Sequence, residues 1–256
     1  MISLIKRIIR KSSALVFLYE RVLFLGHLFK NDILRLRVEK AHVFLKVLPY
    51  TMAGYKRLAN AYDLAQDIEN NGVKGSFVEF GVWKGGISGA MAKVADSRGS
   101  KRIVWLFDSF EGLPEPTDKD GGVAQEYAED KATGKFESIK RCVGPLEDVQ
   151  HLLFSVLRLQ KENIKVEKGW FQETLPLVKT ELGPIAILRL DADWYESTKY
   201  LLEELYDQVV SGGYIIIDDY GHWEGCKKAV DEFMEKRNIK TELIRIDYTG
   251  VYFQKK

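Results

Sequence analysis

The sequence predicts an α/β fold, a Rossmann-like and mostly parallel sheet with helices on both faces. Three observations support this prediction. From residue 51 onward, short apolar segments alternate with longer segments of helical periodicity. Three of the apolar segments end in aspartate, and ligands of open α/β sheets bind beyond the carboxyl ends of the strands. The last two apolar segments are typical of an antiparallel C-terminal hairpin.

Each element follows from its own pattern. Apolar residues recur at helical spacing over 55–71, and the sequence Asn-Asn-Gly ends that helix. Ser197 is the expected N-cap of another helix. The predicted strands are 76–81, 102–108, 163–169, 185–191 and 213–219, with hairpin strands at 241–247 and 250–254. The other predicted helices are 87–97, 174–182, 197–210 and 225–237.

The composition is typical of a globular protein, and the net charge is close to zero. The 256 residues are 46% hydrophobic and 29% charged, and the net charge of +1 gives no reason to expect nucleic acid as a partner. Two cysteines do not make a disulfide framework, which favours a reducing, cytoplasmic location. The four histidines have no metal-ligand spacing.

The first 40 residues form a basic, apolar segment with nine Lys/Arg and three Asp/Glu. We expect a helical N-terminal arm over 1–50 and the main domain over 51–256. Glu20 and Arg21 interrupt the apolar region, so it is too short to span a bilayer and is not a typical signal peptide. The arm either packs on the main domain or a second subunit, as in a homo-oligomer, or contacts a membrane surface as a basic amphipathic helix.

Acidic residues and glycines mark the expected ligand crevice. A strand ends near Glu79, Gly81 follows, and Gly85 and Gly86 open the next helix, where free N–H groups and close backbone approach suit a ligand. The dinucleotide pattern G-x-G-x-x-G is absent from the sequence, and a purely structural tight turn is the alternative. Asp108 ends the second strand, where a carboxylate accepts ribose hydroxyls and repels a phosphate.

Four segments of the sequence resemble the macrocin/mycinamicin O-methyltransferase family: "FVEFGVWKGG", "LFDSFEGLPEP", "LRLDADWYEST" and "IIIDDYGHWEGCKKAVDEF". The resemblance covers 51–254. It implies a class I methyltransferase fold, the cofactor S-adenosylmethionine, and a sugar hydroxyl of a natural product or glycan as acceptor, commonly with Mg²⁺. The cofactor-binding residues that it implies are Thr51, Met52, Glu79, Gly81, Val82, Trp83, Gly85, Asp108, Ser109, Phe110, Trp170 and Phe171.

The same resemblance implies a metal site made of Asp191, Asp218 and Asp219. Magnesium prefers oxygen ligands, and a divalent cation would offset the repulsion among clustered carboxylates. Asp191 is the first candidate for the general base, and Asp193 and His222 are second candidates. Related catechol methyltransferases have a lysine where this chain has Trp194, so a lysine base is not expected.

The segment 113–141 is polar and rich in turn residues, and it follows the second strand directly. We interpret it as a lid or substrate loop, with a disordered insertion as the alternative. Two other functions stay open at this point. One is an enzyme that uses NAD or a nucleotide sugar on a similar sheet, and the other is an inactive cofactor-binding module.

Overall fold

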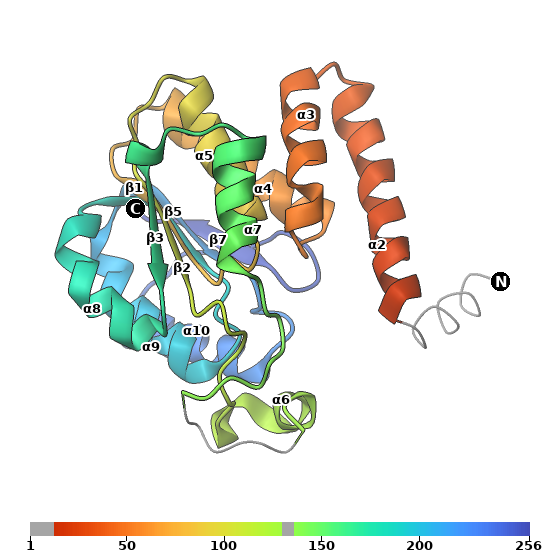
Figure 1. Ribbon diagram of the computed structural model, residues 1–256. Helices are drawn as coiled ribbons and strands as arrows, with labels where there is room; N and C mark the ends of the chain where they lie inside the picture. The colour runs from red at the N-terminus through yellow and green to blue at the C-terminus, as the bar shows by residue number, and fades with distance from the viewer. Residues whose placement is uncertain (1–12, 130–135) are drawn as a thin grey trace.

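The computed structural model describes residues 13–129 and 136–256, so 1–12 of the predicted arm and 130–135 of the predicted lid lie outside it. Over the described residues, a single sheet has seven strands in the order β3-β2-β1-β4-β5-β7-β6 (Figure 1). The strands are β1 (Ser76–Phe80), β2 (Val104–Asp108), β3 (Ile164–Lys168), β4 (Ile185–Leu190), β5 (Val209–Ile217), β6 (Ile244–Arg245) and β7 (Val251–Gln254).

The sheet is mostly parallel, as predicted. Strands β1 to β5 pair in parallel, while β7 is antiparallel to both β5 and β6. The strand order reverses between β1 and β4, and such a reversal is where open α/β sheets bind ligands. The predicted fold class, including the antiparallel C-terminal hairpin, is therefore confirmed.

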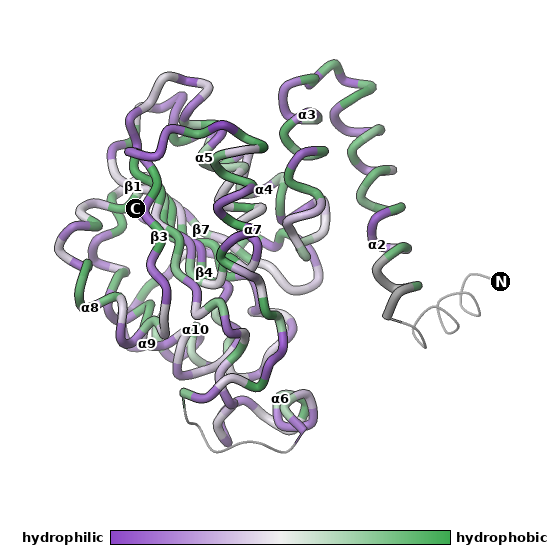
Figure 2. Tube along the Cα trace, in the orientation of Figure 1, coloured by the Kyte–Doolittle hydropathy of each residue, from purple (hydrophilic) through white to green (hydrophobic). Residues whose placement is uncertain are grey.

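Both faces of the sheet are buried, because successive residues of each strand point to opposite faces. Phe77 and Ile216 belong to one apolar cluster, whereas Val78, Ile215 and Ile217 belong to the other. The first cluster includes residues of α4 (Tyr55–Asn70) and α5 (Gly86–Ser97). The second includes residues of α8 (Phe171–Leu182), α9 (Tyr195–Leu205) and α10 (Glu224–Lys236). Figure 2 shows the resulting apolar strands in the middle of the molecule.

The predicted helix 197–210 differs from the structure. Helix α9 begins at Tyr195 with Trp194 as its N-cap, and Val209 already belongs to β5. Ser197 is not the cap, because Asp120 binds the start of the helix instead. The Oδ1 atom of Asp120 accepts a hydrogen bond from the backbone N–H of Tyr195 at 2.6 Å. A carboxylate that is distant in sequence thus satisfies one of the free amides of the helix start.

The remaining elements surround this framework. The N-terminal arm contains α2 (Ser13–Leu28), a π-helix (Phe29–Ile33), α3 (Val38–Val47) and a 3₁₀ turn (Leu48–Tyr50). The predicted lid segment contains a 3₁₀ turn (Asp118–Asp120) and α6 (Gly121–Tyr127). Further short elements are α7 (Leu146–Gln150), a π-helix (His151–Val156) and 3₁₀ turns at Lys161–Asn163 and Tyr206–Gln208. Among the described residues, none of the helices combines the length and the apolar character needed to cross a bilayer.

Substitution of Gly81, in the turn after β1, should destabilise the fold. Gly81 has φ of 80°, and a Cβ atom there would lie 1.9 Å from the carbonyl oxygen of Asp191. We expect Gly81→Ala to lower the free energy of unfolding by about 2 kcal/mol or more, because it adds a backbone clash to a left-handed conformation. Urea denaturation measures this change.

Gly122→Ala is the matched control, because no atom of the described residues lies within 4 Å of a Cβ at that position in α6. It should leave the free energy of unfolding unchanged or raise it slightly. Equal effects of the two substitutions would contradict the packing described for Gly81.

Candidate active site

A cavity lies at the carboxyl ends of β1, β2, β4 and β5, where the strand order predicts a ligand site. It encloses about 1070 Å³, part of which is open to solvent. Fourteen of the predicted site residues line it: Thr51, Met52, Glu79, Gly81, Val82, Trp83, Asp108, Ser109, Trp170, Phe171, Asp191, Asp193, Asp218 and Asp219. Three predicted residues, Gly85, Phe110 and His222, are not part of the lining.

Asp108 is held by the loop that follows β1. Its two carboxylate oxygens accept hydrogen bonds from the backbone N–H groups of Trp83 at 2.9 Å and of Phe110 at 2.7 Å. Burial raises the pKa of Asp108 to about 6, and these backbone hydrogen bonds limit the rise. Each carboxylate oxygen has a second acceptor position, so ribose hydroxyls could still bind Asp108.

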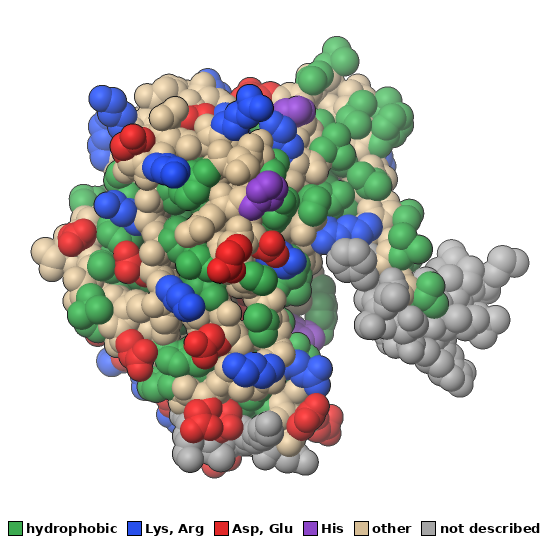
Figure 3. All heavy atoms as spheres, in the orientation of Figure 1, with side chains coloured by type: hydrophobic (Ala, Val, Ile, Leu, Met, Phe, Trp, Pro, Cys, Tyr) green, Lys and Arg blue, Asp and Glu red, His purple; other side chains and the backbone are tan. Residues whose placement is uncertain are grey.

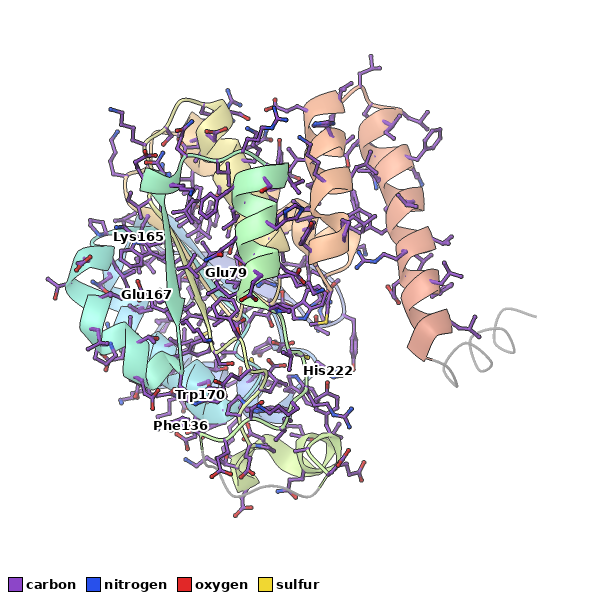
Figure 4. The ribbon with its side chains drawn as sticks, viewed as in Figure 1. Glu79, Phe136, Lys165, Glu167, Trp170 and His222 are labelled. Atoms are coloured by element: carbon purple, nitrogen blue, oxygen red, sulfur yellow. The ribbon has the colours of Figure 1, made fainter. Side chains whose placement is uncertain are left out.

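Trp170 and Phe171 have different surroundings at the start of α8. The ring of Phe171 packs edge-on against Phe80 of β1 at 5.2 Å between centroids, so it is also part of the core. The Trp170 ring stacks on Phe136 of the predicted lid segment, with 6.4 Å between centroids. Figure 4 shows Trp170 and Phe136 near each other, at the end of the sheet that carries the cavity.

Arg189 is a buried cation at the floor of the cavity. Its guanidinium group donates to Glu79 at 2.5 Å and to Asp191 at 3.1 Å, and it also pairs with Asp218. Only 1% of the Arg189 side chain is exposed. Burial raises the pKa of Glu79 to about 7, although Arg189 and a hydrogen bond from Ser88 oppose the rise.

A second arginine, Arg57 of α4, also pairs with Asp218. One oxygen of Asp218 contacts Arg57 and the other contacts Arg189. Burial alone would raise the pKa of Asp218, but the two guanidinium groups outweigh it and lower that pKa. Asp218 is therefore an ionised carboxylate whose charge is already compensated within the protein.

Three carboxylates, Asp191 among them, converge in the cavity. One oxygen atom each of Asp191, Asp193 and Asp219 lies within 4.8 Å of the others. Asp219 is buried, and its Oδ2 atom has no hydrogen-bond partner among the described residues. Burial and then the neighbouring charges of Asp193, Asp191 and Asp218 raise the pKa of Asp219 well above its ordinary value. Burial and Asp191 likewise raise the pKa of Asp193 to about 8.

The converging set differs from the predicted metal set of Asp191, Asp218 and Asp219. Asp193 belongs to the converging set, whereas both oxygens of Asp218 contact arginines, one Arg57 and the other Arg189. Neither arginine was predicted as a site residue. A signal was present for Arg189, since it is a cation inside the otherwise apolar strand β4, where a charge must have a buried partner.

His222 lies outside the main cavity, in an adjoining open groove. This groove shares Leu113, Cys142, Asp193 and Asp219 with the cavity. The His222 ring is exposed and lies 4.3 Å from the ring of Trp223, whose indole N–H donates to Asp193 at 2.8 Å. Figure 4 shows His222 apart from Trp170.

Comparison with known proteins identifies the family. The family described as Macrocin-O-methyltransferase (TylF) matches residues 44–255 of the chain. The chain belongs to the macrocin O-methyltransferase family. It is therefore an S-adenosylmethionine-dependent O-methyltransferase, and the alternative of an NAD- or nucleotide-sugar-dependent enzyme was wrong.

Two curated O-methyltransferases are similar in sequence to this member of the macrocin O-methyltransferase family over most of its length. The demethyldecarbamoylnovobiocin O-methyltransferase of Streptomyces niveus is 39% identical over 80% of this chain and 76% of its own. The 8-demethyl-8-(2,3-dimethoxy-alpha-L-rhamnosyl)-tetracenomycin-C 4'-O-methyltransferase of Streptomyces olivaceus is 37% identical over 80% of this chain and 75% of its own.

Solved structures have the same fold. The O-methyltransferase NovP is 36% identical, with a TM-score of 0.69 over 80% of this chain and 82% of its own. The Podospora anserina methyltransferase PaMTH1, solved with S-adenosylhomocysteine bound, has a TM-score of 0.53 over 93% of this chain and 95% of its own. At 14% identity, the second comparison shows the fold alone.

The carboxylate cluster predicts how stability depends on pH when no metal is added. Asp193 has a pKa of about 8 in the folded state, against about 3.9 in an unfolded chain. The folded state therefore holds this proton more tightly, so its stabilising contribution is complete below about pH 4 and is lost as pH rises through about 8. We expect the thermal midpoint in chelator to fall over this range.

Asp193→Asn removes this titratable group, so the thermal midpoint of the variant should fall less steeply with pH in the same experiment. Asp219 and Asp191, whose pKa values are also raised, would account for the remaining slope. Identical pH profiles for the two proteins would contradict the raised pKa of Asp193.

Proposed function

We propose that the chain transfers a methyl group from S-adenosylmethionine to a hydroxyl group of a sugar, in a natural product or glycan, with Mg²⁺ bound at the acceptor side. The buried and unpartnered Asp219 Oδ2 atom, beside Asp191 and Asp193, carries this proposal. A buried polar oxygen without a partner is a place that a hydroxyl or a cation has to satisfy.

The charge of the cavity supports a cationic donor and a divalent ion. Six carboxyl groups and two arginines are present among the described residues that line it. The arginines compensate Asp218 and part of the charge on Glu79 and Asp191, which leaves Asp108, Asp193 and Asp219 without a cation. The pKa values of these three groups are raised, so protons compensate them in the absence of other cations, and the sulfonium group of the methyl donor and a magnesium ion would replace those protons.

The residues present fit a magnesium ion. Carboxylate oxygens are the ligands that magnesium prefers, and three of them converge from the ends of β4 and β5. Asp191 and Asp219 belong both to the predicted metal site and to the converging carboxylates, so they are the proposed principal ligands. Asp193 lies next to them, and Asp218 is paired with the two arginines. When bound, the ion would favour the deprotonated form of the acceptor hydroxyl.

The proposed donor site uses the first and second strands. Glu79, Gly81, Val82 and Trp83 would lie along the methionine and ribose part of the cofactor, and Thr51 and Met52 also line the cavity. Asp108 and Ser109 would accept the ribose hydroxyls, and Trp170 and Phe171 would flank the adenine. Gly85 and Phe110, which lie outside the lining, would act by shaping the loops.

Asp191 is the proposed general base. Arg189 holds its Oδ2 atom at 3.1 Å, which fixes the carboxylate while leaving the other oxygen outside this contact. Burial and the charge of Asp218 raise the pKa of Asp191, which moves it toward the range that suits a base near neutral pH. Asp191 would take the hydroxyl proton as the acceptor oxygen attacks the methyl group in line with the sulfur. Asp193 and His222 remain second candidates.

The proposed acceptor route is the open groove beside the cavity. Tyr127, His222 and Trp223 give it aromatic walls, and Asp193 and Asp219 lie where it meets the cavity. Aromatic rings and carboxylates together suit a sugar, since the ring C–H groups pack on the rings and the hydroxyls donate to the acids. The names of the relatives support this class, because a 4'-O position of a rhamnosyl group is methylated by one of them.

The general base is tested by Asp191→Asn. We expect the release of S-adenosylhomocysteine with glycoside acceptors to fall by about 100-fold or more, because the amide cannot accept the hydroxyl proton. Calorimetric binding of S-adenosylhomocysteine should survive, since the donor residues are unchanged. Asp207→Asn, an exposed aspartate paired with Arg237, is the control and should stay active. A fully active Asp191→Asn protein would remove Asp191 from the mechanism.

The metal site is tested by magnesium-dependent stabilisation. At pH values above 8, where Asp193 is ionised, added Mg²⁺ should raise the thermal midpoint of the unaltered protein. Asp219→Asn should lose most of this increase, because it removes one of the proposed principal ligands, whereas Asp207→Asn should keep it. An increase of the same size in all three proteins would place the ion elsewhere.

A further inference from the structure

Helix α2 exposes apolar side chains that the main domain does not cover. It contacts the body of the protein through Phe24 and Leu28, which are 3% and 1% exposed. On its other sides, five aliphatic residues are 40% to 59% exposed: Leu15, Leu18, Val22, Leu23 and Leu25. The turn into α3 continues this surface with Leu36 at 83% and Val38 at 69%. Figure 3 shows the apolar side chains gathered along α2 and α3.

The exposed apolar surface of α2 is broad. At about 100° per residue, Leu25, Leu18, Val22, Leu15 and Leu23 cover roughly 160° of the helix circumference. A single partner helix needs only a narrow apolar stripe, whereas a lipid surface contacts a wide one. The breadth of the surface therefore favours a membrane over one docked helix.

The charge of the arm is opposite to that of the rest of the chain. Residues 1–40 contain nine Lys/Arg and three Asp/Glu, which leaves 29 Lys/Arg and 34 Asp/Glu for 41–256. Lys30, Arg35 and Arg37 are exposed beside the apolar surface. The sequence directly before α2, "MISLIKRIIRKS", adds four cations and five Leu or Ile residues. Two arms that packed on each other would bring like charges together, whereas an anionic lipid surface complements them.

We propose that α2 and the turn into α3 dock on an anionic membrane surface, with α2 lying in the interface. The 16 described residues of α2 measure about 24 Å, shorter than the hydrocarbon core of about 30 Å, which fits a helix that lies on the bilayer. Aliphatic side chains would enter the headgroup boundary while the cations of the arm contact lipid phosphates. This proposal does not depend on the methyl-transfer function.

The docking surface is tied to the wall of the cavity. Arg21 of α2 donates to the carbonyl oxygen of Thr51 at 2.8 Å, and it also contacts the carbonyl oxygen of Leu48. Thr51 lines the cavity. An enzyme docked through α2 would therefore hold its cavity at a fixed distance from the membrane surface, which suits an acceptor presented there.

Vesicle co-sedimentation tests the proposal with the full chain. The protein should bind vesicles that contain phosphatidylglycerol, bind pure phosphatidylcholine vesicles much less, and be released by salt. Leu18→Glu with Val22→Glu should weaken binding by roughly tenfold or more, because it places charges in the surface that enters the lipid. Leu177→Glu is the control, since Leu177 is 80% exposed on α8, and it should bind normally.

Circular dichroism and the thermal midpoint show whether the variants are folded. The triple charge reversal of Lys30, Arg35 and Arg37 to Glu is a second test that alters no apolar residue, and it should also weaken binding to phosphatidylglycerol. No binding of the unaltered chain, or equal binding by all variants, would overturn the proposal. It would also be overturned by a stable dimer in light scattering that Leu18→Glu with Val22→Glu dissociates, without any vesicle binding.

Discussion

The buried guanidinium group of Arg189 is the interaction on which the architecture of the site depends. It connects Glu79 at the end of β1, Asp191 just after β4 and Asp218 just after β5, so one cation joins the ends of three neighbouring strands. Three carboxylates at the carboxyl edge of a buried sheet would otherwise repel one another and lose their solvation. Arg57 adds a second cation from α4 and completes the compensation of Asp218.

The arginines divide the acids of the site into two groups with different chemistry. Asp218 is compensated and has a lowered pKa, so it works as a structural anion. Asp193 and Asp219 have no such partner, and their pKa values are raised. Asp191 lies between the groups, because Arg189 holds one of its oxygens while Asp218 and burial raise its pKa. Such a separation of environments is how neighbouring carboxylates come to act as ligand, base and structural anion.

The sequence predicted the sheet well, because its apolar segments are short, end in charged residues and alternate with helical segments. Contacts between distant residues could not be predicted in the same way. Asp120, 75 residues away in sequence, caps α9, so the helix begins at Tyr195 and not at the predicted Ser197. Arg57 meets Asp218 across 161 residues, which no local pattern indicates. Local patterns therefore predicted each acidic residue of the site, but only the structure shows that Asp193 lies beside Asp191 and Asp219.

We propose that carboxylate oxygens of Asp191 and Asp219 bind a divalent cation beside the methyl donor. Anomalous diffraction from a crystal grown with S-adenosylhomocysteine and Mn²⁺, a substitute for Mg²⁺, tests this claim most directly. We expect one strong peak within ligand distance of carboxylate oxygens of Asp191 and Asp219, next to the bound cofactor product. A clean map with the cofactor product in place and no ion at these carboxylates would contradict it.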